Sequence, residues 1–409
     1  MKELKLDNNI ASILKKNDNT PRTAICLYLR INNPEKKAGV YSLLNRLFLQ
    51  GTFNRTAEKL AQELDENGIE LYSEMKYDFI RFKVLALNED IELAYEILAD
   101  IVKNSSLEMF EKEVFKLKGE IEAELDNPKT KLLEDYFKNL YEGHYYGNTY
   151  LRIIEDIDKI TIEDIKEAYS NLLNNSQKCF VVCGDFDEEN MLALQNKYFS
   201  DLKFVENFEN DFWILPLPNK KISKIVKDDA NQAQIIQGWH VPTFNSEDYI
   251  PLMVFNTILG SMGLSSRLFR ELREKKGLAY TVRSSYETNK YGAGFSVYIA
   301  TEPSNIQISL NGFKEEIDKL KNELVSENEL NDAKNNLLGK RQFFTETNIQ
   351  QASLFGYYYS SGLGADYSSI IEKEIMNVTS EQIKNVANKY FNDNYVLSII
   401  APEKFLEEI

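Results

Sequence analysis

The chain has 409 residues, of which 43% are hydrophobic and 12% aromatic, so it can bury more than one hydrophobic core. Its formal net charge of −16 argues against nucleic-acid binding, which needs clustered Lys and Arg, and no such cluster appears in the sequence. It contains no run of about 18 apolar residues, and its amino terminus lacks the apolar segment of a secretory signal. These features predict a soluble, cytoplasmic protein of two domains that binds neither nucleic acid nor membrane.

The first pronounced element is residues 38–52, AGVYSLLNRLFLQGT, which has the pattern of a helix that ends at a glycine. Its apolar face consists of Leu43, Leu44, Leu47 and Phe48. The same helix carries Ser42, Asn45 and Arg46, none of which is a typical metal ligand.

A strand and a helix follow. In residues 78–87, DFIRFKVLAL, the side chains of Phe82, Val84 and Ala86 alternate with charged ones, as in a strand with one solvated face. In residues 90–102, DIELAYEILADIV, the apolar side chains recur at helical spacing, so this helix should pack on the sheet.

Three cysteines, Cys26, Cys179 and Cys183, lie in apolar, strand-like stretches. An odd number of cysteines in such settings is typical of buried thiols in a reducing compartment. Half of a metal site is the alternative for Cys179 and Cys183, but it would require a second pair of ligands, which is absent.

An internal repeat sets the organisation of the chain. The stretch ITIEDIKEAYSNLLNNSQKCFVVCG from Ile160 matches VTSEQIKNVANKYFNDNYVLSIIAP from Val378, at an offset of 218 residues. This period indicates a duplicated domain rather than a solenoid. We predict an α+β protein of two homologous domains, residues 1–215 and 216–409, each a mainly antiparallel sheet with helices packed on it. The linker should be residues 206–224, where acidic residues give way to Pro216 and Pro218.

Several segments together resemble the pitrilysin/insulinase family of zinc peptidases, in its short, processing-peptidase-like branch. They are QGTFNRTAEKLAQELDENGIELYSEMKYDF, FEKEVFKLKGEIEAELDNP, EGHYYGNTY, CFVVCGDFDEENM and SSRLFRELREKKGLAYTVRSSYE. The resemblance covers nearly the whole chain and implies the processing-peptidase-like fold.

That family binds zinc through an H-x-x-E-H motif that ends a few residues before Gly-Thr. Aligned backwards from Gly51 and Thr52, the three motif positions fall on Ser42, Asn45 and Arg46, so every one is lost. The resemblance also implies a third ligand, a Glu on a later helix, and Glu120 matches it, seven residues after Glu113. One carboxylate cannot hold a catalytic zinc, and Glu120 should pair with Arg46 or lie on a solvated helix face.

No two-His ligand set at i, i+4 spacing can be built elsewhere, because the chain has only two histidines, His144 and His240. His144 lies in a turn that resembles a structural H-x-x-G segment of the family, and each histidine is better read as a packed or surface imidazole. The substrate-edge strand of the family, roughly N-A-x-T, is also changed to residues 72–75, YSEM.

In the second half, Arg273 and Tyr280 match an Arg/Tyr pair with which family members engage the substrate. A guanidinium can bind a peptide carbonyl or carboxylate, and a phenol can donate to a developing oxyanion. The alternative is an ordinary helix with surface charges that ends at Gly277.

The resemblance therefore implies a non-catalytic, substrate-binding subunit of a heterodimeric zinc metallopeptidase that acts on peptides or unfolded short proteins. It implies no cofactor in this chain, since the homologous partner would hold the zinc, and it leaves open whether a homodimer forms when the partner is missing. A structural or scaffold protein with no part in proteolysis is the main alternative. A third possibility is an enzyme that acts alone through another site. The sequence does not support it, because it shows no pattern of a nucleophile with a general base.

Overall fold

The computed structural model describes residues 1–205, 219–407 and 409, which form two compact units. The first unit consists of the described residues of Met1–Glu120, Ile153–Phe212 and Gln342–Ser368. The second consists of those of Ile121–Arg152, Trp213–Arg341 and Ser369–Ile409. The predicted boundary at residue 215 lies outside the described residues.

The first unit contains a six-stranded sheet in the order β1-β2-β6-β3-β5-β4. Its strands are β1 (Lys2–Lys5), β2 (Ala11–Lys16), β3 (Arg22–Arg30), β4 (Glu70–Lys76), β5 (Phe79–Leu87) and β6 (Lys178–Gly184). Only β2 and β6 pair in parallel, so the sheet is mainly antiparallel. Strand β4 lies at its edge.

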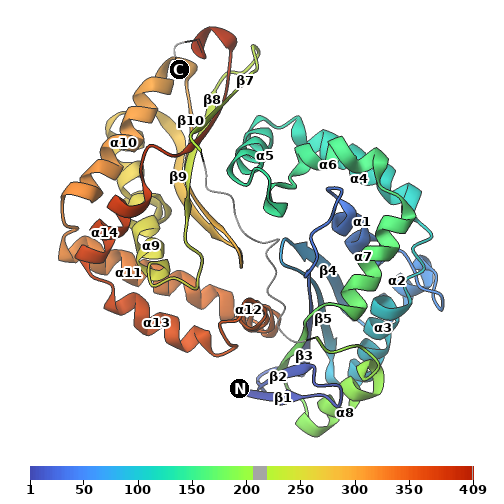
Figure 1. Ribbon diagram of the computed structural model, residues 1–409. Coiled ribbons are helices and arrows are strands. Elements are labelled where there is room, and N and C mark those ends of the chain that lie inside the picture. The colour runs from blue at the N-terminus through green and yellow to red at the C-terminus, as the bar shows by residue number, and fades with distance from the viewer. Residues whose placement is uncertain (206–218, 408) are drawn as a thin grey trace. The chain divides into compact units, whose positions relative to one another are not determined.

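Helices cover both faces of this sheet (Figure 1). One face carries α1 (Val40–Leu47), α3 (Ile91–Asn104) and α7 (Ile162–Asn174), and the other carries α12 (Asn348–Ser361). Three further helices that begin in this unit are α2 (Ala57–Glu66), α4 (Phe110–Leu125) and α8 (Glu188–Phe199). Helix α12 approaches β3 so closely that a Cβ on Gly356 would lie 2.1 Å from the ring of Tyr28. Glycine is therefore needed at this crossing.

The second unit contains a five-stranded sheet in the order β7-β11-β8-β10-β9. Its strands are β7 (Lys221–Val226), β8 (Ala233–Val241), β9 (Ala279–Thr288), β10 (Ala293–Thr301) and β11 (Val396–Ala401). Helix α5 (Pro128–Leu140) packs on β8 and β11. Other helices of this unit are α9 (Tyr249–Asn256), α10 (Ile306–Asn322), α11 (Glu327–Gln342) and α14 (Ser380–Tyr390). Helices also cross between the units in sequence: α6 (Tyr150–Asp156) begins in the second unit, and α13 (Tyr367–Asn377) begins in the first.

The two sheets confirm the internal duplication. Without β1, the first sheet has the same order and the same single parallel pair as the second. The repeated sequence forms α7 and α14, which begin at matching capping boxes on Thr161 and Thr379 and lead into β6 and β11. The fold-class prediction is thus confirmed.

The compact units do not follow the two halves of the sequence throughout. Helix α5 comes from the first half and packs on the second sheet, whereas α12 comes from the second half and packs on the first sheet. A division at residue 215 therefore stays a prediction for the duplicated halves of the chain.

The predicted strand and helix also appear as expected. Phe82, Val84 and Ala86 of β5 are buried, and α3 turns its apolar side chains onto that strand. All three cysteines are free and buried in the core on the α12 side of the sheet, which agrees with the packing interpretation. Among the described residues, no helix is both long and apolar enough to cross a bilayer.

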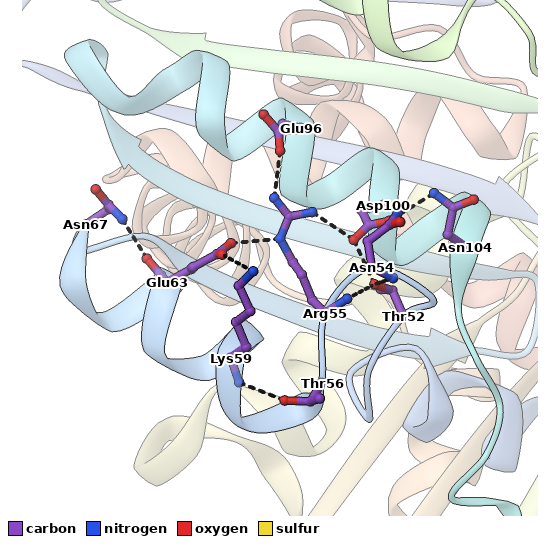
Figure 2. A network of polar contacts seen from close by, with 10 residues as sticks. All are labelled: Thr52, Asn54, Arg55, Thr56, Lys59, Glu63, Asn67, Glu96, Asp100 and Asn104. Atoms are coloured by element: carbon purple, nitrogen blue, oxygen red, sulfur yellow. Dashed lines mark hydrogen bonds and ion pairs between the residues drawn. The ribbon is translucent and has the colours of Figure 1, made fainter.

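A polar network ties the loop after α1 to α2 and α3 (Figure 2). Arg55 donates to carboxylates of Glu63, Glu96 and Asp100, and Thr52 donates to Asp100 at 2.7 Å. The Asp100 carboxylate is buried, and burial alone would raise its pKa. Hydrogen bonds, from Asn104 and Thr52 among others, outweigh burial and lower that pKa. The network fixes the end of the helix that carries the candidate site.

Candidate functional site

Helix α1 presents the three positions that align with the zinc motif. Glu35 starts the helix, because its carboxylate accepts from the backbone N–H groups of Gly39 and Tyr41 at 2.9 and 2.8 Å. The predicted apolar face, Leu43, Leu44, Leu47 and Phe48, is completely buried. Packing of this face fixes the direction in which the polar side chains of α1 point.

Two of the three polar side chains contact the edge strand β4. Ser42 donates to the sulfur of Met75 at 3.5 Å, and Ser73 donates to the side-chain oxygen of Asn45 at 2.6 Å. The structure thus brings together the helix and the strand that sequence comparison singled out as changed. Neither contact provides a group with the basicity of an imidazole.

Arg46 binds two carboxylates of α4. Its Nη1 and Nη2 donate to the two oxygens of Glu120 at 2.8 and 2.9 Å, and its Nε donates to Glu113 at 2.8 Å. This is the bidentate geometry in which an Arg–carboxylate pair is strongest. The predicted ion pair of Arg46 with Glu120 is therefore confirmed.

Glu113 is the partner that sequence reasoning missed. Its side chain is 1% exposed, whereas that of Glu120 is 57% exposed. Burial alone would raise the pKa of Glu113, but hydrogen bonds from Lys116 and Arg46 outweigh it and lower that pKa. The available signal was the seven-residue interval between the two glutamates, which places both on one face of α4.

These residues do not fit a zinc ion. A guanidinium has five N–H donors and no lone pair to give to a metal, and it occupies both acceptor oxygens of Glu120 and one of Glu113. In the described parts of the chain, no group of three or more His, Cys, Asp or Glu side chains has the geometry of a metal site.

Both histidines lie in the second unit and serve in packing. His144 accepts from the backbone N–H of Tyr146 at 3.1 Å and caps a short 3-10 turn, as expected for a structural residue. His240 of β8 donates from Nε2 to the carbonyl of Leu140 at the end of α5. The ring centroids of Tyr141 and His240 are 5.4 Å apart.

The pH dependence of stability should report the burial of His240. Burial lowers the pKa of His240, although its hydrogen bond to Leu140 opposes this effect. Below the pKa of a free imidazole, about 6.5, the unfolded chain takes up a proton that the folded chain resists, so stability falls as the pH falls. We expect the free energy of unfolding to decrease less steeply between about pH 7 and 5.5 in His240→Gln than in the wild type. Equal slopes in urea titrations would contradict this packing role.

Arg273 and Tyr280 lie together, as the resemblance predicts. Arg273 belongs to a π-helical segment, Phe269–Lys275, and Tyr280 to the edge strand β9. Nη1 of Arg273 donates to the backbone carbonyl of Tyr280 at 2.7 Å, and Cζ lies 4.5 Å from the centre of the Tyr280 ring. The Tyr280 side chain points into solvent and is 78% exposed.

Arg273 differs from the other cations of its segment. Arg270 pairs with Glu329, Lys275 with Glu271, and Lys276 with Glu315. Among the residues that the structure describes, no carboxylate pairs with Arg273.

Comparison with known proteins agrees with the fold. The family model described as "Insulinase (Peptidase family M16)" matches residues 13–155, and the model described as "Peptidase M16 inactive domain" matches residues 159–337. The chain is 29% identical to an uncharacterized zinc protease of Rickettsia felis, over 91% of this chain and 90% of that protein. It is 22% identical to an uncharacterized zinc protease of Bacillus subtilis, over 98% of both chains.

Solved structures show the same fold. A protease from Helicobacter pylori superposes with a TM-score of 0.89 and 22% identity, over 98% of this chain and 99% of that one. A peptidase M16 inactive domain from Pseudomonas fluorescens gives a TM-score of 0.87 at 20% identity, over 98% of both. Together these matches define the class of the protein as an M16-type peptidase fold. The chain belongs to the pitrilysin/insulinase family and to its short branch.

Metal content should follow the residues present at the site. Because Ser42, Asn45 and Arg46 offer no imidazole, purified protein should contain well under one equivalent of zinc and should show no metal-dependent cleavage by itself. Elemental analysis after dialysis measures this. Stoichiometric, tightly held zinc would contradict the interpretation of the site.

A variant in which the H-x-x-E-H motif is restored provides the matched comparison for metal content. Ser42→His, Asn45→Glu and Arg46→His together supply the missing side chains, with Glu120 as the third ligand. We expect zinc binding without efficient cleavage, because activity also needs side chains that orient the ligands, and the strand at residues 72–75 has changed. Efficient peptide cleavage by the triple variant would show that the strand is unimportant.

Proposed function

We propose that this chain is the non-catalytic, substrate-binding subunit of a heterodimeric zinc metallopeptidase that acts on peptides or unfolded short proteins in the cytoplasm. The observation that carries the proposal is the Arg46 fork on Glu113 and Glu120, which puts a cation where the family motif would require a metal ligand. The helix and its packing remain, while the metal-binding chemistry is absent from its polar face.

Residues of the second unit support a role of this chain in binding the peptide substrate. Arg273 and Tyr280 form one exposed pair on an edge strand, and the guanidinium keeps donors that no carboxylate of the described chain uses. Such a pair suits a peptide carbonyl or carboxylate. The relatives named zinc proteases support a setting in proteolysis, with the zinc supplied by a homologous partner.

The partner is the part of the proposal that is easiest to test. A chain of the same genome that resembles this one and contains H-x-x-E-H, ideally from the adjacent reading frame, should be expressed together with it. Light scattering of the purified product should give the mass of a heterodimer, and this 47.4 kDa chain alone should give a homodimer or a monomer. If the two chains never copurify and this chain instead joins another assembly, the scaffold alternative is the better one.

A further inference from the structure

The guanidinium of Arg273 contacts two aromatic rings. Its Cζ atom is 4.6 Å from the ring centre of Phe269 and 4.5 Å from that of Tyr280. Both distances are in the range of cation–π contacts. Packing restricts the side chain of Phe269 more than that of Tyr280, because Phe269 is 9% exposed whereas Tyr280 is 78% exposed.

The local backbone produces this arrangement. Residues Phe269–Lys275 are π-helical, and the N–H of Lys276 donates to the carbonyl of Glu271 at 3.1 Å. Arg273 follows Phe269 after about one turn, so its side chain passes over the Phe269 ring. Gly277, at φ 63°, then reverses the chain and brings Tyr280 back to Arg273. Short π-helical segments occur frequently at functional sites.

We propose that Phe269 is a positioning residue for Arg273. Its buried ring fixes the plane of the guanidinium, while the exposed Tyr280 ring alone would leave that plane free to turn. In this orientation Nη1 is used by the Tyr280 carbonyl. No described residue accepts from Nε or Nη2, so both stay available for an acceptor oxygen on a peptide. This inference rests on the proposed function for its consequence in catalysis, but the positioning itself is a property of the isolated chain.

Nuclear magnetic resonance of the isolated chain tests the positioning directly. The Nε–Hε signal of Arg273, assigned by its loss in Arg273→Lys, should be shifted upfield by the two rings. We expect Phe269→Leu to remove much of that shift and Phe269→Tyr to keep it. Phe255→Leu is the control, because Phe255 is fully buried in the same unit but contacts Phe295 and Phe391. An unchanged Arg273 signal in Phe269→Leu would overturn the proposal.

Kinetics of the complex with the zinc-bearing partner test the consequence. Phe269→Leu should impair the same parameter, kcat or KM, as Arg273→Ala, by about 2- to 30-fold, which corresponds to the usual range of a cation–π contact. In the Arg273→Ala background, Phe269→Leu should have no further effect, whereas Phe255→Leu should have the same effect in both backgrounds.

The NMR measurement and the kinetics together distinguish a failure of the Phe269 proposal from a failure of the proposed function. Additive effects of Phe269→Leu and Arg273→Ala, or wild-type kinetics of Phe269→Leu, would overturn the role of Phe269. If the wild-type complex does not cleave peptides at all, the proposed function fails, and the Arg273 signal alone then decides whether Phe269 positions the guanidinium.

Discussion

Replacement of Arg46 by methionine should lower the free energy of unfolding by about 1–3 kcal/mol, the usual cost of leaving a buried hydrogen-bonding group without one of its partners. Glu113 would keep only Lys116 as a charged partner, although its carboxylate is 1% exposed. Loss of the Arg46 hydrogen bond and charge would leave Lys116 alone to oppose burial, so the pKa of Glu113 would be lowered less than in the wild type. Chemical denaturation followed by circular dichroism measures the change in stability.

Glu120→Gln is the matched control, because Glu120 is 57% exposed and receives the same guanidinium. An exposed pair of this kind contributes at most about 1 kcal/mol. Glu113→Gln in the Arg46→Met background should recover part of the loss, since no buried charge then stays unpaired. If Arg46→Met and Glu120→Gln are equally mild, Arg46 forms only a surface ion pair.

Tyr280→Phe should lower kcat of the heterodimer, by at most about 10²–10³-fold, and should leave assembly intact. That factor is what removal of one oxyanion donor costs in other enzymes. Arg273→Ala should raise KM if the guanidinium binds substrate and transition state equally, and should lower kcat if it binds only the transition state more tightly. Steady-state kinetics with a peptide substrate separate the two parameters.

Arg270→Ala is the control for this pair. Arg270 precedes Arg273 by three residues on the same segment, but it already pairs with Glu329 at 3.5 Å. It should therefore change stability slightly and kinetics hardly at all. Wild-type kinetics for Tyr280→Phe, Arg273→Ala and Arg270→Ala alike would remove the binding role and favour a scaffold.

Much of the fold follows from local patterns in the sequence. Alternation over β5 and helical spacing over α3 each specify one buried face, and the structure has both. The repeat offset of 218 residues predicted a second domain of the same construction, and the two sheets share one strand order. These features depend on neighbours in the sequence, which a pattern can reveal.

Long-range packing does not follow from such patterns. The helical spacing of residues 128–140 and 348–361 says that each helix has an apolar face, but not that each packs on the sheet of the other half. The same limit applies to the site. The family resemblance suggested Arg46 with Glu120 and Arg273 with Tyr280, whereas the roles of Glu113 and Phe269 depend on which side chains the fold buries beside each guanidinium.

The central claim is that this chain contributes substrate binding but no metal chemistry to a two-subunit peptidase. The most direct measurement compares peptide cleavage by this chain, by its H-x-x-E-H-bearing partner, and by their mixture. We predict cleavage only in the mixture, lost when either motif histidine of the partner is replaced and reduced by Arg273→Ala in this chain. Zinc-dependent cleavage by this chain alone, or a partner that is equally active without it, would contradict the claim.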